Sequence, residues 1–273
     1  MGKNRKKILN AMERALQMNY RRVIYAEPGA VPPEISGVRH YSYMPRIAMA
    51  LSGELRNRIF FNGKFQEMSF FPGEVLFFPS NIWNVAPTIM GESECFGINL
   101  SPYYLRLINY FITKQTPLDK NEPEYFFHLP ETRATSREFF KLLEMMGRSK
   151  DSENFAPELV RMTFRLFYAD LCNYEESPDK GAYMTYLQIV NFIEENFRSD
   201  LLRDDVAQHF NLSSTYISKL FNRFAEGMTF NRLLNNVRLS AAAKLLQNST
   251  MNCEEIAIIC GYQDPKYFNR RFH

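Results

Sequence analysis

The spacing of hydrophobic and polar positions divides this chain into a strand-rich half and a helical half. Between residues 23 and 100, short apolar runs alternate with turn signals about every ten residues, which is typical of a small β-sandwich or barrel. Asn62-Gly63 stands between two such runs, 55–61 and 64–70, and predicts a type I′ hairpin. From residue 183 onward, apolar residues recur at every third or fourth position, as on amphipathic helices.

Residues 101–174 are expected to form helices that pack on the barrel or join two subunits. In three stretches, 103–114, 136–148 and 157–174, apolar residues stand at helical spacing. After them, residues 175–182 are polar and contain both proline and glycine, which indicates a linker.

The first 22 residues carry seven basic side chains and one acidic one. Their apolar residues, such as Ile8 and Met12, form a helical stripe. This segment is therefore either a helix docked on its own domain or a basic arm that touches DNA phosphates or a partner. We favour the docked helix.

One pattern occurs twice near the C-terminus, in residues 204–224 and again in residues 254–272. Each copy has a short first helix containing an alanine, then a turn, then a polar second helix. Asn211 and Gly261 occupy the same place in the two turns, and both residue types tolerate the left-handed conformation that a sharp turn needs. The repeat predicts two helix-turn-helix units.

Candidate N-caps precede the second helix of each copy: Ser213 or Ser214 in the first and Asp264 in the second. Between the copies, residues 229–247 predict a connecting helix roughly 28 Å long at about 1.5 Å per residue. A rigid helix of that length can place two readers in successive major grooves of DNA.

The outward positions of the two second helices carry side chains that can bond base edges or phosphates. On the first of them, Tyr216, Ile217, Leu220, Phe221 and Phe224 are expected to face inward. The alternative is a plain helical bundle with solvated lysines, which the duplication disfavours. The candidate DNA-contacting residues are Thr215, Ser218, Lys219, Asn222, Arg223, Lys266, Asn269 and Arg270.

Three motifs in this region carry a family resemblance: SxxYISKLFxRF, NxVRLxxAxxLL and IAxxCGYxDxxYFxRxF. Together they resemble the C-terminal double helix-turn-helix of the AraC/XylS family of bacterial transcription regulators. The resemblance implies binding of double-stranded DNA, a homodimer, and activation or repression at promoters, with RNA polymerase as a further partner to consider. In the commoner form of the family a short helix follows the last phenylalanine, so the C-terminal end, at His273, is expected to be truncated.

The run GEL–FFPGEVLFFPSNIWNV resembles the cupin barrel that often precedes this DNA reader. The expected architecture is therefore multi-domain: an N-terminal all-β, cupin-like (jelly-roll) barrel over 23–100 with trailing helices, and an all-α double helix-turn-helix domain over 183–273. Arg39, Tyr41, Arg46 and Trp83 are candidates to line a small-molecule site in the barrel. The alternative, a barrel filled by its own phenylalanines that binds nothing, stays open.

Composition and chemistry narrow the function further. The net charge of +3 does not by itself call for nucleic acid. Metal cupins carry a histidine pair, whereas here His40 stands alone and Asn84 fills a place where a histidine is often found, so neither a metal nor another cofactor is expected. The rival class is a cupin-type or DNA-repair enzyme fused to the same DNA reader, but Cys95 and Cys172 are isolated and no catalytic residue stands out.

The remaining signals concern location. The four cysteines form no CxxC pair or disulfide framework, which favours a reducing cytoplasm. No apolar run reaches the roughly 18 residues of a membrane span, and the basic start of the chain lacks the apolar region of a signal peptide. A cytoplasmic protein without a membrane partner is therefore expected.

Overall fold

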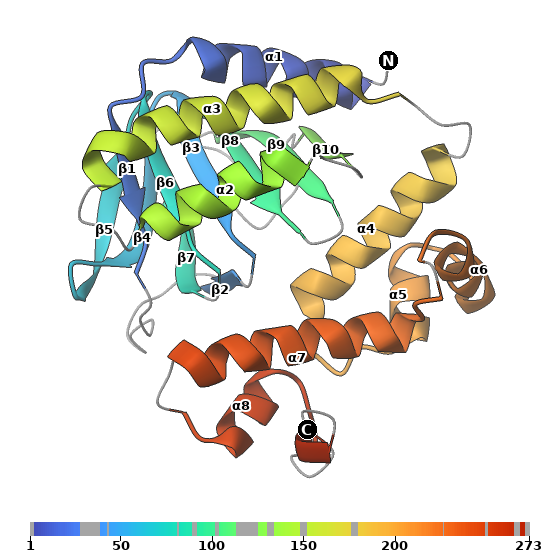
Figure 1. Cartoon of the computed structure of the whole chain (residues 1–273). Coiled ribbons are helices and arrows are strands. Elements are labelled where there is room, and N and C mark those ends of the chain that lie inside the picture. The colour runs from blue at the N-terminus through green and yellow to red at the C-terminus, as the bar shows by residue number, and fades with distance from the viewer. Residues whose placement is uncertain are drawn as a thin grey trace. The chain divides into compact units, whose positions relative to one another are not determined.

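A computed structural model of the chain divides into two compact units, Met1–Glu175 and Glu176–His273 (Figure 1). The division falls inside the segment 175–182 that the sequence predicts as a linker. The structure describes residues 3–27, 39–42, 44–80, 82–88, 92–101, 104–112, 125–129, 134–147, 152–175, 180–225, 227–248, 251–264 and 268–270.

The first unit is built on two β-sheets in the part of the chain that the structure describes. The larger sheet has six strands in the order β1-β6-β3-β8-β9-β10, and the smaller has four in the order β2-β7-β4-β5. Only β1 and β6 pair in parallel among the described pairs. The strands are β1 (Arg22–Tyr25), β2 (Arg39–Ser42), β3 (Arg46–Ser52), β4 (Leu55–Phe61), β5 (Lys64–Phe70), β6 (Glu74–Phe78), β7 (Ile82–Thr88), β8 (Ser93–Leu100), β9 (Leu105–Ile112) and β10 (Tyr125–Leu129).

The predicted hairpin is confirmed. Phe61 pairs with Lys64 across the turn, and Asn62 and Gly63 have φ of 52° and 73°. A type I′ turn needs positive φ at both central positions, which Asn-Gly tolerates at little cost. A buried cluster that includes Leu55 and Phe70 of the smaller sheet and Leu76 and Phe78 of the larger joins the two sheets. The cupin identity of this two-sheet arrangement stays a prediction.

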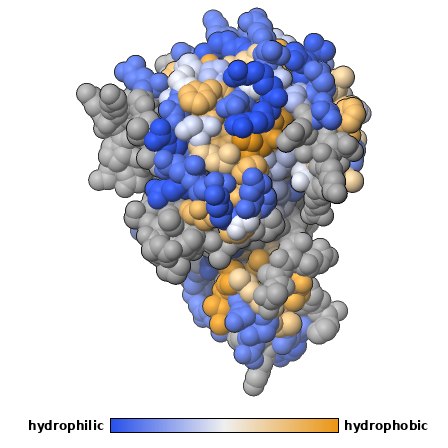
Figure 2. Space-filling model, turned by 90° about the vertical axis from the view of Figure 1, so that its left-hand side faces the viewer, coloured by the Kyte–Doolittle hydropathy of each residue, from blue (hydrophilic) through white to orange (hydrophobic). Residues whose placement is uncertain are grey.

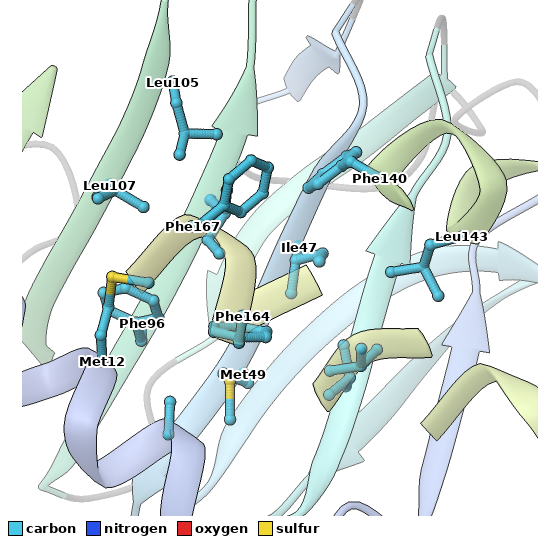
Figure 3. Packing of buried hydrophobic residues seen from close by; sticks show 14 of the residues in the cluster. Met12, Ile47, Met49, Phe96, Leu105, Leu107, Phe140, Leu143, Phe164 and Phe167 are labelled. Atoms are coloured by element: carbon cyan, nitrogen blue, oxygen red, sulfur yellow. The ribbon is translucent and has the colours of Figure 1, made fainter. Parts of the chain in front are cut away.

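Three helices, α1 (Lys3–Gln17), α2 (Ala134–Met146) and α3 (Ser152–Asn173), cover one face of the larger sheet (Figure 1). Figure 3 shows how Phe164 and Phe167 of α3 and Phe140 of α2 pack on Ile47 and Phe96 of the strands. Phe167 lies in a segment expected either to pack on the barrel or to join two subunits, and it is fully buried in this core. The sheet beneath it accounts for its apolar character.

The basic helix α1 is docked on its own unit. Ile8, Ala11, Met12 and Ala15 are fully buried in the core shared with α3 and the sheet. The guanidinium of Arg14 also makes two hydrogen bonds to the carboxylate of Glu94. Because the apolar stripe is used for packing, the docked helix, not the free arm, describes this segment.

The prediction of helices throughout 101–174 is wrong for its first part. Residues 103–114 were expected to be helical, but Leu105–Ile112 form β9, and Tyr125–Leu129 form β10 beside it. Leu105 and Leu107 lie under the helices, while Tyr110 packs toward the smaller sheet. A strand covered on both faces carries apolar residues at odd and even positions alike, so its spacing can imitate that of a helix.

The second unit is helical. It contains α4 (Lys180–Asn196), α5 (Arg203–His209), α6 (Ser214–Phe224), α7 (Phe230–Asn248) and α8 (Cys253–Ile259), and residues 268–270 are also helical. The connecting helix predicted over 229–247 is therefore present as α7. Over the described part of the chain, no helix combines the length and apolar character that crossing a membrane requires.

Candidate nucleic-acid interface

The first helix-turn-helix is formed by α5 and α6. Asn211 has a φ of 54°, and the N–H of Leu212 donates to the carbonyl of Ala207 at 2.8 Å to close the turn. The hydroxyl of Ser213 then accepts from the N–H of Tyr216 at 3.1 Å, so Ser213 is the N-cap. Such a cap satisfies a backbone donor that the helix itself leaves unpaired. The start of α6 is thereby fixed against α5.

The two faces of α6 are sharply different. Ile217, Leu220 and Phe221 are buried. The exposed positions are Thr215, Lys219, Asn222 and Arg223. Tyr216, which we expected to face inward, is 37% exposed and lies at the edge of the polar face.

Ser218 differs from the other candidates because its hydroxyl is engaged within the unit. It donates to the carbonyl of Ser214 at 3.1 Å and accepts from the guanidinium of Arg203 at 2.9 Å. Arg203, at the start of α5, is thus brought to the polar face of α6. Arg203 does not stand out in the sequence because it precedes the repeated pattern, which begins at residue 204. A groove beside Arg203 is lined by residues in, or directly before, the helices α5, α6 and α7: Leu202, Arg203, Asp204, Ser218, Phe221, Asn222, Thr229, Phe230 and Asn231.

The second turn repeats the first at an offset of fifty residues. The N–H of Tyr262 donates to the carbonyl of Ala257 at 3.0 Å, matching the bond between Leu212 and Ala207. Gly261 has a φ of 84° and stands where Asn211 stands in the first turn. A Cβ at this glycine would lie 2.7 Å from the carbonyl oxygens of Phe197 and Arg198, so this turn requires glycine sterically as well as conformationally.

After this turn, Phe268 is buried and its ring packs at a tilt against Tyr262, with ring centroids 5.1 Å apart. Asn269 and Arg270 are exposed on the helical residues 268–270. Lys266 lies outside the described residues. The second helix-turn-helix thus presents two of its three candidate DNA-contacting side chains on the side away from the buried Phe268.

The connecting helix α7 links both turns through Arg238. Its guanidinium donates to the carbonyls of Phe197 and Ser199 at 2.7 and 2.9 Å, and it lies 5.5 Å from the centroid of the Tyr262 ring. One side chain therefore joins the C-terminal end of α4, the connector and the second turn.

The candidate small-molecule residues lie on both sheets. Arg46 is half-buried on β3, with its guanidinium 4.2 Å from the centroid of the Phe78 ring. Arg39 and Tyr41 belong to β2 and Trp83 to β7, where Tyr41 and Trp83 are cross-strand partners. The side chains of these three lie outside what the structure describes.

The cysteines and acids bear on the enzyme alternative. Burial raises the pKa of the Cys260 thiol to about 11, which keeps it protonated in the packed turn. Among the described residues, no three His, Cys, Asp or Glu side chains are grouped so that they could hold a metal ion.

A left-handed turn residue followed by helical residues with a buried apolar side chain occurs twice around a connecting helix, and in the first copy the second helix is polar and capped. Together these features define a helix-turn-helix DNA-binding domain. A family model described as a helix-turn-helix domain matches residues 206–273. The chain is 27% identical over 231 residues to the uncharacterised HTH-type transcriptional regulator YpdC of Escherichia coli (strain K12), covering 84% of this chain and 77% of that protein.

A second E. coli K12 protein, the uncharacterised HTH-type transcriptional regulator YijO, is 24% identical over 257 residues, covering 93% of this chain and 85% of that protein. Among solved structures, ToxT from Vibrio cholerae O395 matches with a TM-score of 0.37 and 12% identity over 85% of each chain. The family model and the curated relatives confirm the resemblance to the AraC/XylS family. The protein is a transcription regulator with an AraC-type helix-turn-helix DNA-binding domain.

Proposed function

We propose that this regulator reads double-stranded promoter DNA through α6 and through the helical residues 268–270, one in each of two major grooves. The observation that supports the proposal is the exposed polar face of α6, whose orientation is set by the Ser213 cap and the Asn211 turn. Recognition helices of this motif present such a face to base edges.

The candidate residues divide into two roles. Lys219, Arg223 and Arg270 carry the charge that neutralises phosphates, and Arg203 joins them beside α6. Thr215, Asn222 and Asn269 have the donors and acceptors that distinguish base pairs. Ser218 and Lys266 complete the proposed contact set, Ser218 through its hydroxyl shared with Arg203.

The test begins with selection of tight-binding duplexes from a random pool by the purified chain. Fluorescence anisotropy on the selected duplex then measures affinity as a function of salt. Lys219→Ala should weaken binding to all sequences and lower the salt slope by about one, because one phosphate contact is lost.

Asn222→Ala should instead cost about 1–3 kcal/mol at one base pair and relax specificity there. The matched control is Lys141→Ala, an exposed lysine on α2 of the first unit. If Lys219→Ala and Lys141→Ala gave the same affinity and salt slope, the assignment of the α6 face would be wrong.

We also propose that the first unit is a cupin-like barrel that binds a small-molecule effector and forms a homodimer, and that the regulator acts in the cytoplasm with RNA polymerase at promoters. Four large apolar side chains remain exposed on α2 and α3, which supports the dimer: Leu142, Met145, Phe155 and Met162. Figure 2 shows one face of the molecule, on which apolar groups lie among hydrophilic ones.

Analytical ultracentrifugation tests the dimer. Met145→Asp should give a folded monomer, because Met145 is 65% exposed and its replacement disturbs no core packing. Phe167→Asp is the contrasting variant and should unfold the unit. A Met145→Asp variant with the dimer mass of the wild type would place the subunit contact elsewhere.

A further inference from the structure

A single row of side chains crosses five strands of the larger sheet. The cross-strand partners run from Phe78 on β6 to Arg46 on β3, then to Asn99 on β8, Arg106 on β9 and His128 on β10. Adjacent partners in a sheet have their side chains on the same face. Two arginines, an asparagine and a histidine therefore stand side by side.

This row lies on the face opposite the covering helices. The residues next to Arg106 along β9, Leu105 and Leu107, belong to the core under α1–α3. Because side chains alternate along a strand, Arg106 and its partners point the other way. Phe78, at one end of the row, belongs to the core between the two sheets, so the row faces the space on the side of the smaller sheet.

The neighbouring row on the same face is apolar and has small residues at its centre. Ala48 and Gly97 are cross-strand partners there, flanked by Leu76 and Ile108. A Cβ added at Gly97 would meet only the Ile47 carbonyl at 3.5 Å and the Ile108 Cβ at 3.9 Å, which are ordinary contacts with strands of its own sheet. Among the described residues, a β-carbon would therefore be accommodated at this point.

His128 supplies an independent observation that points to a ligand. Its side chain is 1% exposed, yet neither ring nitrogen has a hydrogen-bond partner among the described residues. The ring is held edge-on against Tyr104 and Phe126, at centroid distances of 4.9 and 5.5 Å. Buried polar groups are nearly always hydrogen-bonded, because leaving one unsatisfied costs the full desolvation of that group.

The charges beside His128 indicate which kind of ligand would form hydrogen bonds with its ring nitrogens. Strands lie about 4.8 Å apart, so Arg46 and Arg106 begin about 10 Å from each other on either side of Asn99. Guanidinium groups bind carboxylates with two parallel hydrogen bonds.

We propose that this row binds the carboxylate of a small organic acid that has an apolar body. Arg46 and Arg106 supply the positive charge, and the imidazole N–H of His128 donates a hydrogen bond to a carboxylate oxygen. The apolar body lies over Ala48 and Gly97. The inference rests on the proposed effector-binding role of the first unit and states the chemical class of its ligand.

The experiment uses the purified full chain and matched pairs of probes: benzoate with benzamide, and hexanoate with hexanamide. Isothermal titration calorimetry should detect the acids and not the amides, and thermal shift should show stabilisation by the acids alone. Arg106→Gln should weaken acid binding about tenfold or more, since it removes a charged hydrogen-bonding partner. Arg22→Gln, an arginine 51% exposed on β1, is the matched control and should bind as the wild type does.

A second variant, Gly97→Leu, places a branched side chain beside the row and should also abolish acid binding. Circular dichroism checks the fold of each variant. The inference is overturned if acids and amides behave alike, if no acid binds the wild type, if sulfate binds as well as benzoate, or if Arg106→Gln keeps full affinity. Anisotropy on the selected DNA duplex distinguishes failure of this inference from failure of the proposed function. If the wild type binds DNA but no acid, this inference alone is refuted. If the wild type does not bind DNA, the proposed function is refuted.

Discussion

Arg238→Ala should loosen the joint between the two helix-turn-helix units without unfolding either sheet of the first unit. Arg238 is half-buried on α7 and bonds two carbonyls at the end of α4, those of Phe197 and Ser199. The same guanidinium lies over the ring of Tyr262 in the second turn. Truncation to alanine removes all of these contacts together.

The magnitude follows from the contacts. A hydrogen bond from a charged donor contributes about 1.5–3 kcal/mol, and two bonds at a half-exposed position fall toward the lower end of that range. A cation–π contact adds about 0.5–1 kcal/mol. Two bonds of about 1.5 kcal/mol each and the cation–π contact total about 3.5–4 kcal/mol, which corresponds to roughly three- to seven-hundredfold faster amide exchange by local opening.

Hydrogen exchange followed by mass spectrometry measures this directly on peptides from α8 and from the end of α4. The matched control is Arg232→Ala, an exposed arginine six positions earlier on the same helix. Arg238→Lys should be intermediate, because an ammonium keeps the charge but lacks the planar pair of donors. Equal amide exchange rates in Arg238→Ala and Arg232→Ala would refute the idea that the Arg238 side chain joins the two helix-turn-helix units.

Three further predictions concern stability. Burial and the nearby charge of Arg106 lower the pKa of His128 from 6.5 to about 3, so the unfolded chain takes up a proton at a higher pH than the folded chain does. The free energy of unfolding should therefore fall as the pH drops from about 6.5 to about 3. Denaturant titration should show that this loss of stability in acid is smaller in His128→Phe. Gly261→Ala should lower the melting temperature more than Gly227→Ala does. Both glycines have a φ of 84°, but only at Gly261 would an added Cβ meet backbone atoms. Equal melting temperatures of the two variants would refute the steric argument. Arg14→Ala should lower the free energy of unfolding by about 1–3 kcal/mol, because it leaves the buried carboxylate of Glu94 without the guanidinium that bonds it. An unchanged midpoint in chemical denaturation would show that α1 docks through apolar packing alone.

Local features of this protein could be read directly from its sequence. Asn62-Gly63 specifies a hairpin because few other pairs accept positive φ at both positions. The duplicated turns could be located because Asn211 and Gly261 meet the same conformational demand, and Ser213 caps the helix that follows. These signals depend on residues close together in the chain, and backbone sterics give each a narrow meaning.

The candidate DNA-contacting face was also predictable for most of its members. On α6 the exposed and buried positions follow a helical period, so Lys219 and Arg223 fall opposite Leu220 and Phe221. Arg203 could not be assigned in this way, because it reaches Ser218 across a turn and no periodicity connects the two.

What only the tertiary structure decided is which strands lie side by side. Residues 103–114 carry apolar side chains on both faces of a covered strand, so their spacing is ambiguous between helix and strand, and we predicted a helix. With that prediction, Arg106 and His128 belonged to no sheet. Pairing of β9 with β8 and β10 places them level with Arg46, which lies sixty residues before Arg106. Strand register is set by long-range pairing and burial, and a sequence read one segment at a time contains neither.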